Sequence, residues 1–235
     1  MNRLSATLFF SFFMVCSLSL NVLSAQDFQA EIQKVLDEQG TTIYGVDAGG
    51  ATLNFGGISA ALVVPDGSFF TAVAGQATPI ILVDDTQLFG LSDVGQLVLS
   101  VLTMAMLEEG TINLDAKVSD YADLSMLTNV SGDVSLRQLM GHTAGLDNFS
   151  DADDYSSTVL FDVNKVFTPS EITQSFVDEL VPLGNFNYAN TSFLVLGLAL
   201  EGANGNETLQ ETLERLILSK AGISGEMQFY ESEDP

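Results

Sequence analysis

The sequence predicts an α+β fold in which a β-hairpin near the N-terminus precedes a mostly helical body. Two apolar runs, residues 58–64 and 68–74, flank the turn residues Pro65, Asp66 and Gly67, which is the pattern of a hairpin. Beyond residue 92 the apolar residues recur at helical spacing instead. With 235 residues, 46% of them hydrophobic, the chain is long enough for one sizeable domain with a core.

Residues 1–25 have the organisation of a signal peptide. Arg3 provides a short positive region, residues 4–20 are apolar, and small residues at 24–25 mark a cleavage point. A retained membrane anchor is the alternative, because the apolar run is nearly long enough to span a bilayer. On either interpretation we expect residues 26–235 to be exported, to the periplasm or the extracellular space. Cys16, the single cysteine, lies in this segment, so the mature protein would form no disulfide.

The remaining elements follow in chain order. Four apolar residues lie on one helical face between a predicted cap at Asp27 and a stop at Gly40: Phe28, Ile32, Val35 and Leu36. Residues 41–57 are rich in glycine, so we expect them to be irregular before the hairpin. Residues 93–109 form a predicted helix that Gly110 ends, and the absence of charge over 94–107 indicates burial on most sides.

The C-terminal half continues with shorter helices. They are predicted at residues 134–140, 193–201 and 209–218. A further helix starts where Thr168 can act as cap, Pro169 occupies the first position and Glu171 the third. Residues 147–157 are polar and acidic and are predicted to form a loop.

The charge is strongly negative, with 31 acidic residues against 7 basic ones and a net charge of −24. A field of this sign repels nucleic acid and anionic membranes and opposes ligands that carry a carboxylate. The acidic residues at 147–154 could hold calcium, but they lack the spacing of an EF-hand, and a solvated loop is the alternative. No pattern for zinc, a phosphate loop or a dinucleotide is present, so we expect neither a metal site nor a cofactor.

Ser92 immediately precedes the long apolar helix. The N–H groups at a helix start stabilise negative charge, which suits a nucleophile whose attack on a carbonyl group produces an oxyanion. Serine is also a preferred N-cap, so a purely structural role is the alternative.

Three parts of the sequence resemble the serine β-lactamase and penicillin-binding-protein superfamily, in the branch of class C β-lactamases, D-Ala-D-Ala carboxypeptidases and related esterases. They are residues 88–115, which begin LFGLSDVG and end MLEEGTINLD, residues 135–146 (SLRQLMGHTAGL), and residues 184–198. The resemblance implies a β-lactamase/transpeptidase-like fold, with the hairpin in an antiparallel sheet packed with the helical region. The family's C-terminal strands and third motif, Lys-Thr-Gly or His-x-Gly, are missing. Residues 26–235 are therefore expected to be an incomplete, C-terminally truncated domain whose hairpin exposes an edge.

The same resemblance implies a serine hydrolase that cleaves amides or esters through an acyl-serine intermediate. Ser92 would be the nucleophile, Tyr188 the acid/base and Asn190 the residue that orients substrate. The family's lysine, one turn after the serine, is Gly95 here, and residues 75–116 contain no lysine or arginine. We therefore expect weak activity or none, as in a pseudoenzyme. Tyr188 could act as base only with a lowered pKa; an ordinary half-buried tyrosine beside a loop asparagine is the alternative.

Other functions stay open. His142, the single histidine, could form a Ser-His-Asp triad with Asp147 or Asp93, although Val94 replaces the second glycine of the nucleophile-elbow pattern. A non-catalytic exported protein could bind peptide or cell-wall fragments on the same scaffold, and an inactive truncated product is the third possibility. The expected partner is a small-molecule amide or ester, or a cell-wall peptide, without nucleic acid and without stable membrane insertion unless the signal segment is retained.

Overall fold

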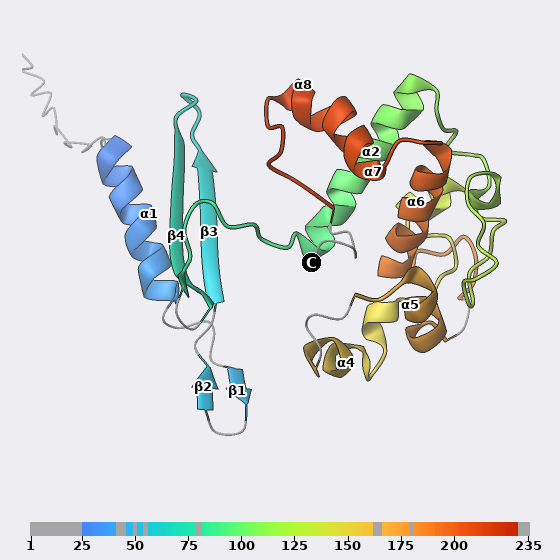
Figure 1. Cartoon of the computed structure of the whole chain (residues 1–235), viewed down its shortest axis with the longest axis horizontal. Coiled ribbons are helices and arrows are strands. Elements are labelled where there is room, and N and C mark those ends of the chain that lie inside the picture. The colour runs from blue at the N-terminus through green and yellow to red at the C-terminus, as the bar shows by residue number, and fades with distance from the viewer. Residues whose placement is uncertain are drawn as a thin grey trace, which may run out of the picture. The chain divides into compact units, whose positions relative to one another are not determined.

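The computed structural model describes residues 25–40, 46–48, 51–53, 56–78, 81–161, 166–178 and 181–229. The chain divides into two compact units, residues 1–89 and residues 90–235. Both are drawn in Figure 1, and each is described by itself below. The predicted signal peptide lies outside the described residues except for Ala25. Among the described residues, no helix has the length and apolar character needed to cross a bilayer.

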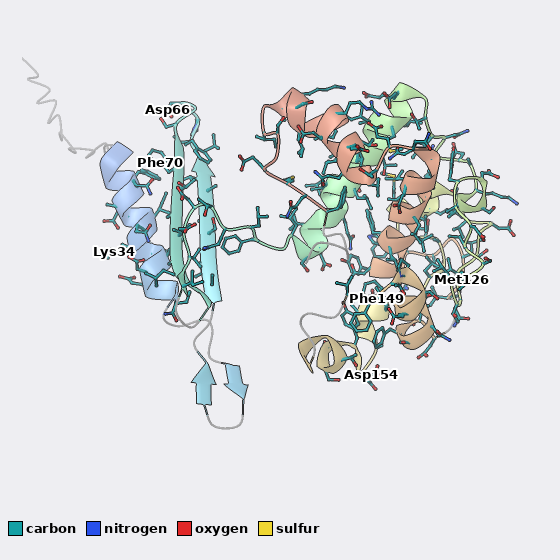
Figure 2. The ribbon with its side chains drawn as sticks, viewed as in Figure 1. Lys34, Asp66, Phe70, Met126, Phe149 and Asp154 are labelled. Atoms are coloured by element: carbon teal, nitrogen blue, oxygen red, sulfur yellow. The ribbon has the colours of Figure 1, made fainter. Side chains whose placement is uncertain are left out.

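The first unit packs one helix against an antiparallel sheet (Figure 1). Its elements are α1 (Ala25–Gly40), β1 (Val46–Ala48), β2 (Ala51–Leu53), β3 (Gly56–Val63), β4 (Phe69–Thr78) and β5 (Ile81–Leu82). Strands β3, β4 and β5 are neighbours in that order, and β1 pairs with β2 separately. The predicted hairpin is confirmed, with Ile58 opposite Ala74 and Val63 opposite Phe69. Asp66 lies in its turn (Figure 2) and accepts a hydrogen bond from the Ser68 N–H at 2.8 Å.

Two predictions about this unit were wrong. The helix begins at Ala25 and runs through Asp27, so Asp27 is not its cap. Residues 41–57, predicted to be irregular, include the paired strands β1 and β2. Short strands of small residues interrupted by glycine carry too little periodic signal to be recognised locally.

Side chains of α1 cover β4. Phe28 stacks on Phe70, which Figure 2 labels, with ring centroids 5.6 Å apart, and Leu36 is buried with Ala72 and Ala74. The Gln33 amide donates to the Val73 carbonyl oxygen at 2.7 Å, and the Gln29 amide donates to that of Thr71. The hairpin edge that was expected to be exposed is thus partly covered. Glutamine side chains of α1 donate hydrogen bonds to carbonyl oxygens of β4, and β5 pairs with the end of the same strand.

The second unit is helical, which confirms the predicted α+β class for the chain as a whole. Its elements are η1 (Ser92–Val94), α2 (Gly95–Glu109), η2 (Val118–Asp120), α3 (Leu136–Met140), η3 (Phe149–Asp151), α4 (Tyr155–Phe161), α5 (Pro169–Phe176), α6 (Asn190–Ala203), α7 (Leu209–Leu213), the π-helical η4 (Glu214–Leu218) and α8 (Ser219–Ala221). Residues 147–157 were predicted to be a loop, but they contain η3 and the start of α4.

Local capping fixes several helix ends in this unit. The Thr168 hydroxyl accepts from the Glu171 N–H at 3.2 Å, and the Glu171 carboxylate accepts from the Thr168 N–H at 2.9 Å. This reciprocal capping box begins α5 as predicted, with Pro169 at the first position. Gly110 ends α2 with a left-handed φ of 82°, which a residue without Cβ adopts at little cost.

The core of the second unit lies between α2 and α6. Leu102, Met106, Leu196 and Leu200 are fully buried there. The opposite face of α2 is exposed, with Leu97 at 66%, Val101 at 44% and Met104 at 44%. The prediction that α2 is buried on most sides was therefore wrong, because apolar composition shows a preference for burial and not the presence of a covering partner.

Candidate active site

Ser92 begins η1 with a φ of 46°, in the left-handed region that residues with a Cβ rarely adopt. Such backbone strain costs about 1–3 kcal/mol and gathers at functional sites. The N-cap of η1 is Leu91 and that of α2 is Val94. The interpretation of Ser92 as a helix cap is therefore wrong. Its exposed side chain lies at a helix start but does not cap the helix.

A pocket of about 560 Å³ opens beside Ser92 in the second unit. Ser92, Gly95 and Gln96 line it from η1 and α2, and Asn190 lines it from the start of α6. The remaining lining residues are Asp93, Leu99, Phe149, Ser150, Tyr155, Phe193 and Phe229. Two of the three predicted site residues, Ser92 and Asn190, are thus brought to one cavity although 98 positions separate them in the sequence.

Gln96, on α2, is hydrogen-bonded to both Tyr188, just before α6, and Asn190, the first residue of α6. Its side-chain N–H₂ donates to the Tyr188 hydroxyl oxygen at 2.9 Å and to the Asn190 side-chain oxygen. The Tyr188 hydroxyl donates in turn to the same Asn190 oxygen at 3.0 Å. Tyr188 is not among the pocket-lining residues, so it reaches the site through this triangle of hydrogen bonds.

Asn190 is held by Asn148, just before η3, and by Ser150, within η3. Its backbone N–H donates to the side-chain oxygen of Asn148 at 2.9 Å, and its side-chain N–H₂ donates to the Ser150 hydroxyl at 3.0 Å. Next to it, the Thr191 hydroxyl accepts from the Phe149 N–H at 3.1 Å. Because both ends of the amide are engaged, Asn190 presents one orientation to the pocket.

The environment of Tyr188 raises the pKa of its hydroxyl group above the ordinary value. Burial is the largest cause, and the negative charges of Asp93 and Asp151 act in the same direction, while the hydrogen bond from Gln96 opposes them. A tyrosine base would need the reverse shift. The raised pKa keeps the Tyr188 hydroxyl protonated, so it is not a ready proton acceptor.

Gly95 occupies the place of the missing lysine. It lines the pocket with ordinary helical angles, φ −56° and ψ −28°. A Cβ added there would meet no atom within 4 Å. Among the described lining residues none is lysine, arginine or histidine, so no nitrogen base faces Ser92 from them.

His142 packs against the segment that carries Tyr188. Its ring packs against Tyr188 at 4.6 Å and Phe193 at 5.4 Å between centroids, and its Nδ1 atom accepts from the Ala189 N–H at 3.2 Å. It does not line the pocket that holds Ser92. The Ser-His-Asp arrangement is therefore not assembled, and His142 instead orients the segment that carries Tyr188.

The acidic residues of the predicted calcium alternative do not form a ligand cluster. The Asp147 carboxylate accepts from the Asp178 N–H at 3.3 Å. Across the described part of the chain, no three side chains of His, Cys, Asp or Glu gather closely enough to hold a metal ion.

We expect the free energy of unfolding to fall as the pH is lowered below about 6.5, because burial lowers the pKa of His142 in the folded protein. Between the folded and unfolded pKa values of His142 the unfolded chain binds more protons than the folded one. The contribution of His142 to the free energy of unfolding is therefore fully present above the unfolded pKa and is lost as the pH falls through the folded pKa. Urea titrations between about pH 7.5 and about pH 5 measure this. Asparagine tolerates a positive φ and does not titrate, so His142→Asn should show a flatter profile. Equal slopes in the two proteins would contradict the assignment.

Sequence reasoning missed the residues that hold the site together. Gln96 lies four positions after Ser92, and residues at that spacing share a helical face, which is a signal that could have found it. Asn148 and Ser150 contact Asn190 across about 40 positions, and no local pattern marks them.

Known proteins share parts of this sequence and of this fold. A family profile described as Beta-lactamase matches residues 45–229. The chain is 25% identical over 139 residues to the probable fimbrial assembly protein FimD, serogroup H1, of Dichelobacter nodosus, a match that covers 58% of this chain and 34% of that protein. A D-stereospecific amidohydrolase from Streptomyces sp. superposes with a TM-score of 0.59 at 20% identity, over 83% of this chain and 54% of the other.

The penicillin binding protein from Bacillus halodurans gives a TM-score of 0.54 at 24% identity, over 72% of this chain and 52% of the other. The chain thus spans about half of the length of these solved structures, and about a third of the curated relative. The structural matches confirm the predicted β-lactamase/transpeptidase-like α+β fold.

Proposed function

Because this chain belongs to the β-lactamase family, we propose that it is an exported serine hydrolase that attacks small amides or esters with Ser92. The observation that carries the proposal is the pocket that joins the strained Ser92 to Asn190. The name of the D-stereospecific amidohydrolase supports an amide as the reacting group, and the name of the penicillin binding protein supports a small molecule with a reactive amide. The apolar segment before residue 26 supports export.

The proposed reaction uses the groups of this pocket in turn. The Ser92 oxygen bonds to the substrate carbonyl carbon while its proton passes to solvent, and the Ser92 N–H stabilises the resulting oxyanion. The C–N or C–O bond then breaks, and the departing amine or alkoxide takes a proton from the Tyr188 hydroxyl. Asn190 holds the substrate through its side-chain amide. Water finally hydrolyses the acyl-serine ester: its oxygen goes to the acyl carbon, one of its protons goes to the Ser92 oxygen, and the Tyr188 phenolate recovers its proton from solvent.

The missing base limits this reaction. A positioned general base contributes about 10²- to 10⁴-fold to a rate, and here Gly95 supplies none, while the raised pKa of Tyr188 keeps its hydroxyl protonated and so unable to accept the serine proton. We therefore propose slow turnover in which formation of the acyl-serine is the difficult step.

Ser92→Ala should abolish covalent labelling by a fluorophosphonate. The unmodified protein is expected to gain one adduct, mapped by peptide mass analysis to Ser92, when folded and none after heat denaturation. Ser100→Ala is the matched control, because Ser100 lies on α2 and its hydroxyl donates to the Gln96 carbonyl oxygen at 2.7 Å. That variant should label like the unmodified protein.

A second candidate function is non-catalytic binding of peptide or cell-wall fragments. It is favoured by the absence of a base at Gly95 together with the raised pKa of Tyr188. A cooperatively folded protein that gives no adduct at any reagent concentration would reject the hydrolase proposal in favour of this one.

A further inference from the structure

The pocket beside Ser92 has one charged side chain among its described lining residues, the carboxylate of Asp93. The rest of the lining is neutral, and much of it is aromatic or aliphatic: Leu99, Phe149, Tyr155, Phe193 and Phe229. Phe149, labelled in Figure 2, packs edge-on against Tyr155 with ring centroids 5.2 Å apart. A cavity of about 560 Å³ with such walls fits a small organic ligand.

Two carboxylates lie close enough to the Tyr188 hydroxyl to affect its pKa. Asp93 interacts with the Tyr188 hydroxyl, and both Asp93 and Asp151 raise the pKa of that group, after the larger effect of burial. The Tyr188 hydroxyl is in turn hydrogen-bonded to the pocket-lining Asn190. Two carboxylates therefore set the potential where a substrate would lie against Asn190.

The described cations of the second unit lie elsewhere. Three are held in ion pairs: Lys117 with Asp133, Arg137 with Asp115, and Arg215 with Glu109 and Glu207. Lys220 lines a different groove, beside α2 and η4. A ligand carboxylate in the Ser92 pocket would thus meet Asp93 with no cation among the described lining residues to offset the repulsion.

We propose that this pocket takes substrates with an ammonium group next to an apolar side chain, such as amino-acid amides and esters with a free amino group. Asp93 receives the ammonium group, and the aromatic rings hold the apolar side chain and face the cation. This inference rests on the proposed function, since it names the substrate class of the same site. It separates this pocket from one that selects a substrate by its carboxylate.

Binding measured by calorimetry tests the proposal without requiring turnover. Phenylalanine amide carries the cation at about pH 6, N-acetylphenylalanine amide is its neutral counterpart, and N-acetylphenylalanine is anionic. We expect the cation to bind about tenfold more tightly than the neutral ligand, and the anion to bind most weakly. Raising the salt concentration from about 0.05 to about 0.5 M should weaken binding of the cation alone.

Two variants with the same change in net charge separate the pocket from the overall field. Asp93→Asn should reduce the preference for the cation to about twofold or less. Glu201→Gln should leave it intact, because Glu201 is exposed near the far end of α6, roughly 16 Å along the helix from Asn190. If Asp93→Asn folds poorly, Asp93→Ser removes the same carboxylate and takes its place in this comparison.

Equal affinity for the cation and the neutral ligand, a preference that survives Asp93→Asn, or no binding of any of the three would overturn the proposal. The proposed hydrolase activity fails by a different result. A preference for the cation without a fluorophosphonate adduct on Ser92 rejects the hydrolase and keeps the ammonium pocket, whereas an adduct without the preference does the opposite.

Discussion

Gly95→Lys should raise the rate of ester hydrolysis by about 10²- to 10⁴-fold, the contribution expected of a positioned general base. Gly95 lines the pocket that holds Ser92 and lies three residues after it, so an amine on this position shares the serine's side of the helix start. The added side chain finds open space, and the backbone angles are those of an ordinary helix. Replacing glycine near the start of α2 also adds about 0.5–1 kcal/mol of helix stability.

The gain should depend on pH in a defined direction. The carboxylate of Asp93, which lines the same pocket, raises the pKa of an introduced amine, since a nearby opposite charge favours the charged form. Only the neutral amine accepts the serine proton, so the rate of ester hydrolysis should increase toward about pH 9 and above. Steady-state kinetics with an activated ester across this range measures the effect.

Gly95→Gln is the matched control for this experiment. It adds a side chain of similar reach and a similar gain in helix propensity, but it has no basic nitrogen, so its melting temperature should rise without a gain in rate. A folded Gly95→Lys protein that shows no increase at any pH would mean that more than the base is missing from the site.

Gly202→Ala should destabilise the second unit by about 2–3 kcal/mol, the cost of forcing a methyl group into a packed contact. Gly202 lies in the last turn of α6, and a Cβ there would overlap the backbone carbonyl oxygen of Tyr121, just after η2. Backbone on both sides must shift to make room, because no flexible side chain can give way. Urea unfolding followed by a probe in the second unit should show a lower midpoint with an unchanged slope.

The same substitution at Gly197 should have the opposite sign. Gly197 is also in α6, but its added Cβ would lie 3.9 Å from a Leu99 methyl group, an ordinary contact. Gly197→Ala is therefore expected to stabilise the protein by about 0.5–1 kcal/mol through helix propensity alone. If the two variants shifted the unfolding midpoint in the same direction, the packing of α6 against η2 would be incorrect.

The parts of the fold that sequence reasoning predicted are those fixed by neighbours in the chain. Thr168 and Glu171 cap each other, Gly110 ends α2, and Asp66 sits in the turn of the hairpin. Each of these acts over four residues or fewer, so the pattern contains the whole interaction. The family resemblance supplied the positions of Ser92 and Asn190, which share one pocket.

The parts that sequence reasoning missed depend on contacts between distant segments. Gln96 reaches Tyr188 across 92 positions, and its role follows from the proximity of α2 to the start of α6 in the folded chain. The raised pKa of Tyr188 comes first from burial and then from Asp93 and Asp151, and all three depend on segments that are remote in sequence. The exposed face of α2 shows the same limit, because apolar residues such as Leu97 give no sign of whether another element covers them.

Because the backbone of Ser92 is left-handed, the residue kept at this position indicates whether its hydroxyl group is under selection. Glycine adopts such a φ at little steric cost, whereas a residue with a Cβ pays about 1–2 kcal/mol for it. A lineage that had abandoned the hydroxyl group would gain stability by drifting to glycine, without any compensating change elsewhere. The residue found at this position in descendants of the same ancestor therefore distinguishes a nucleophile still under selection from an inherited relic.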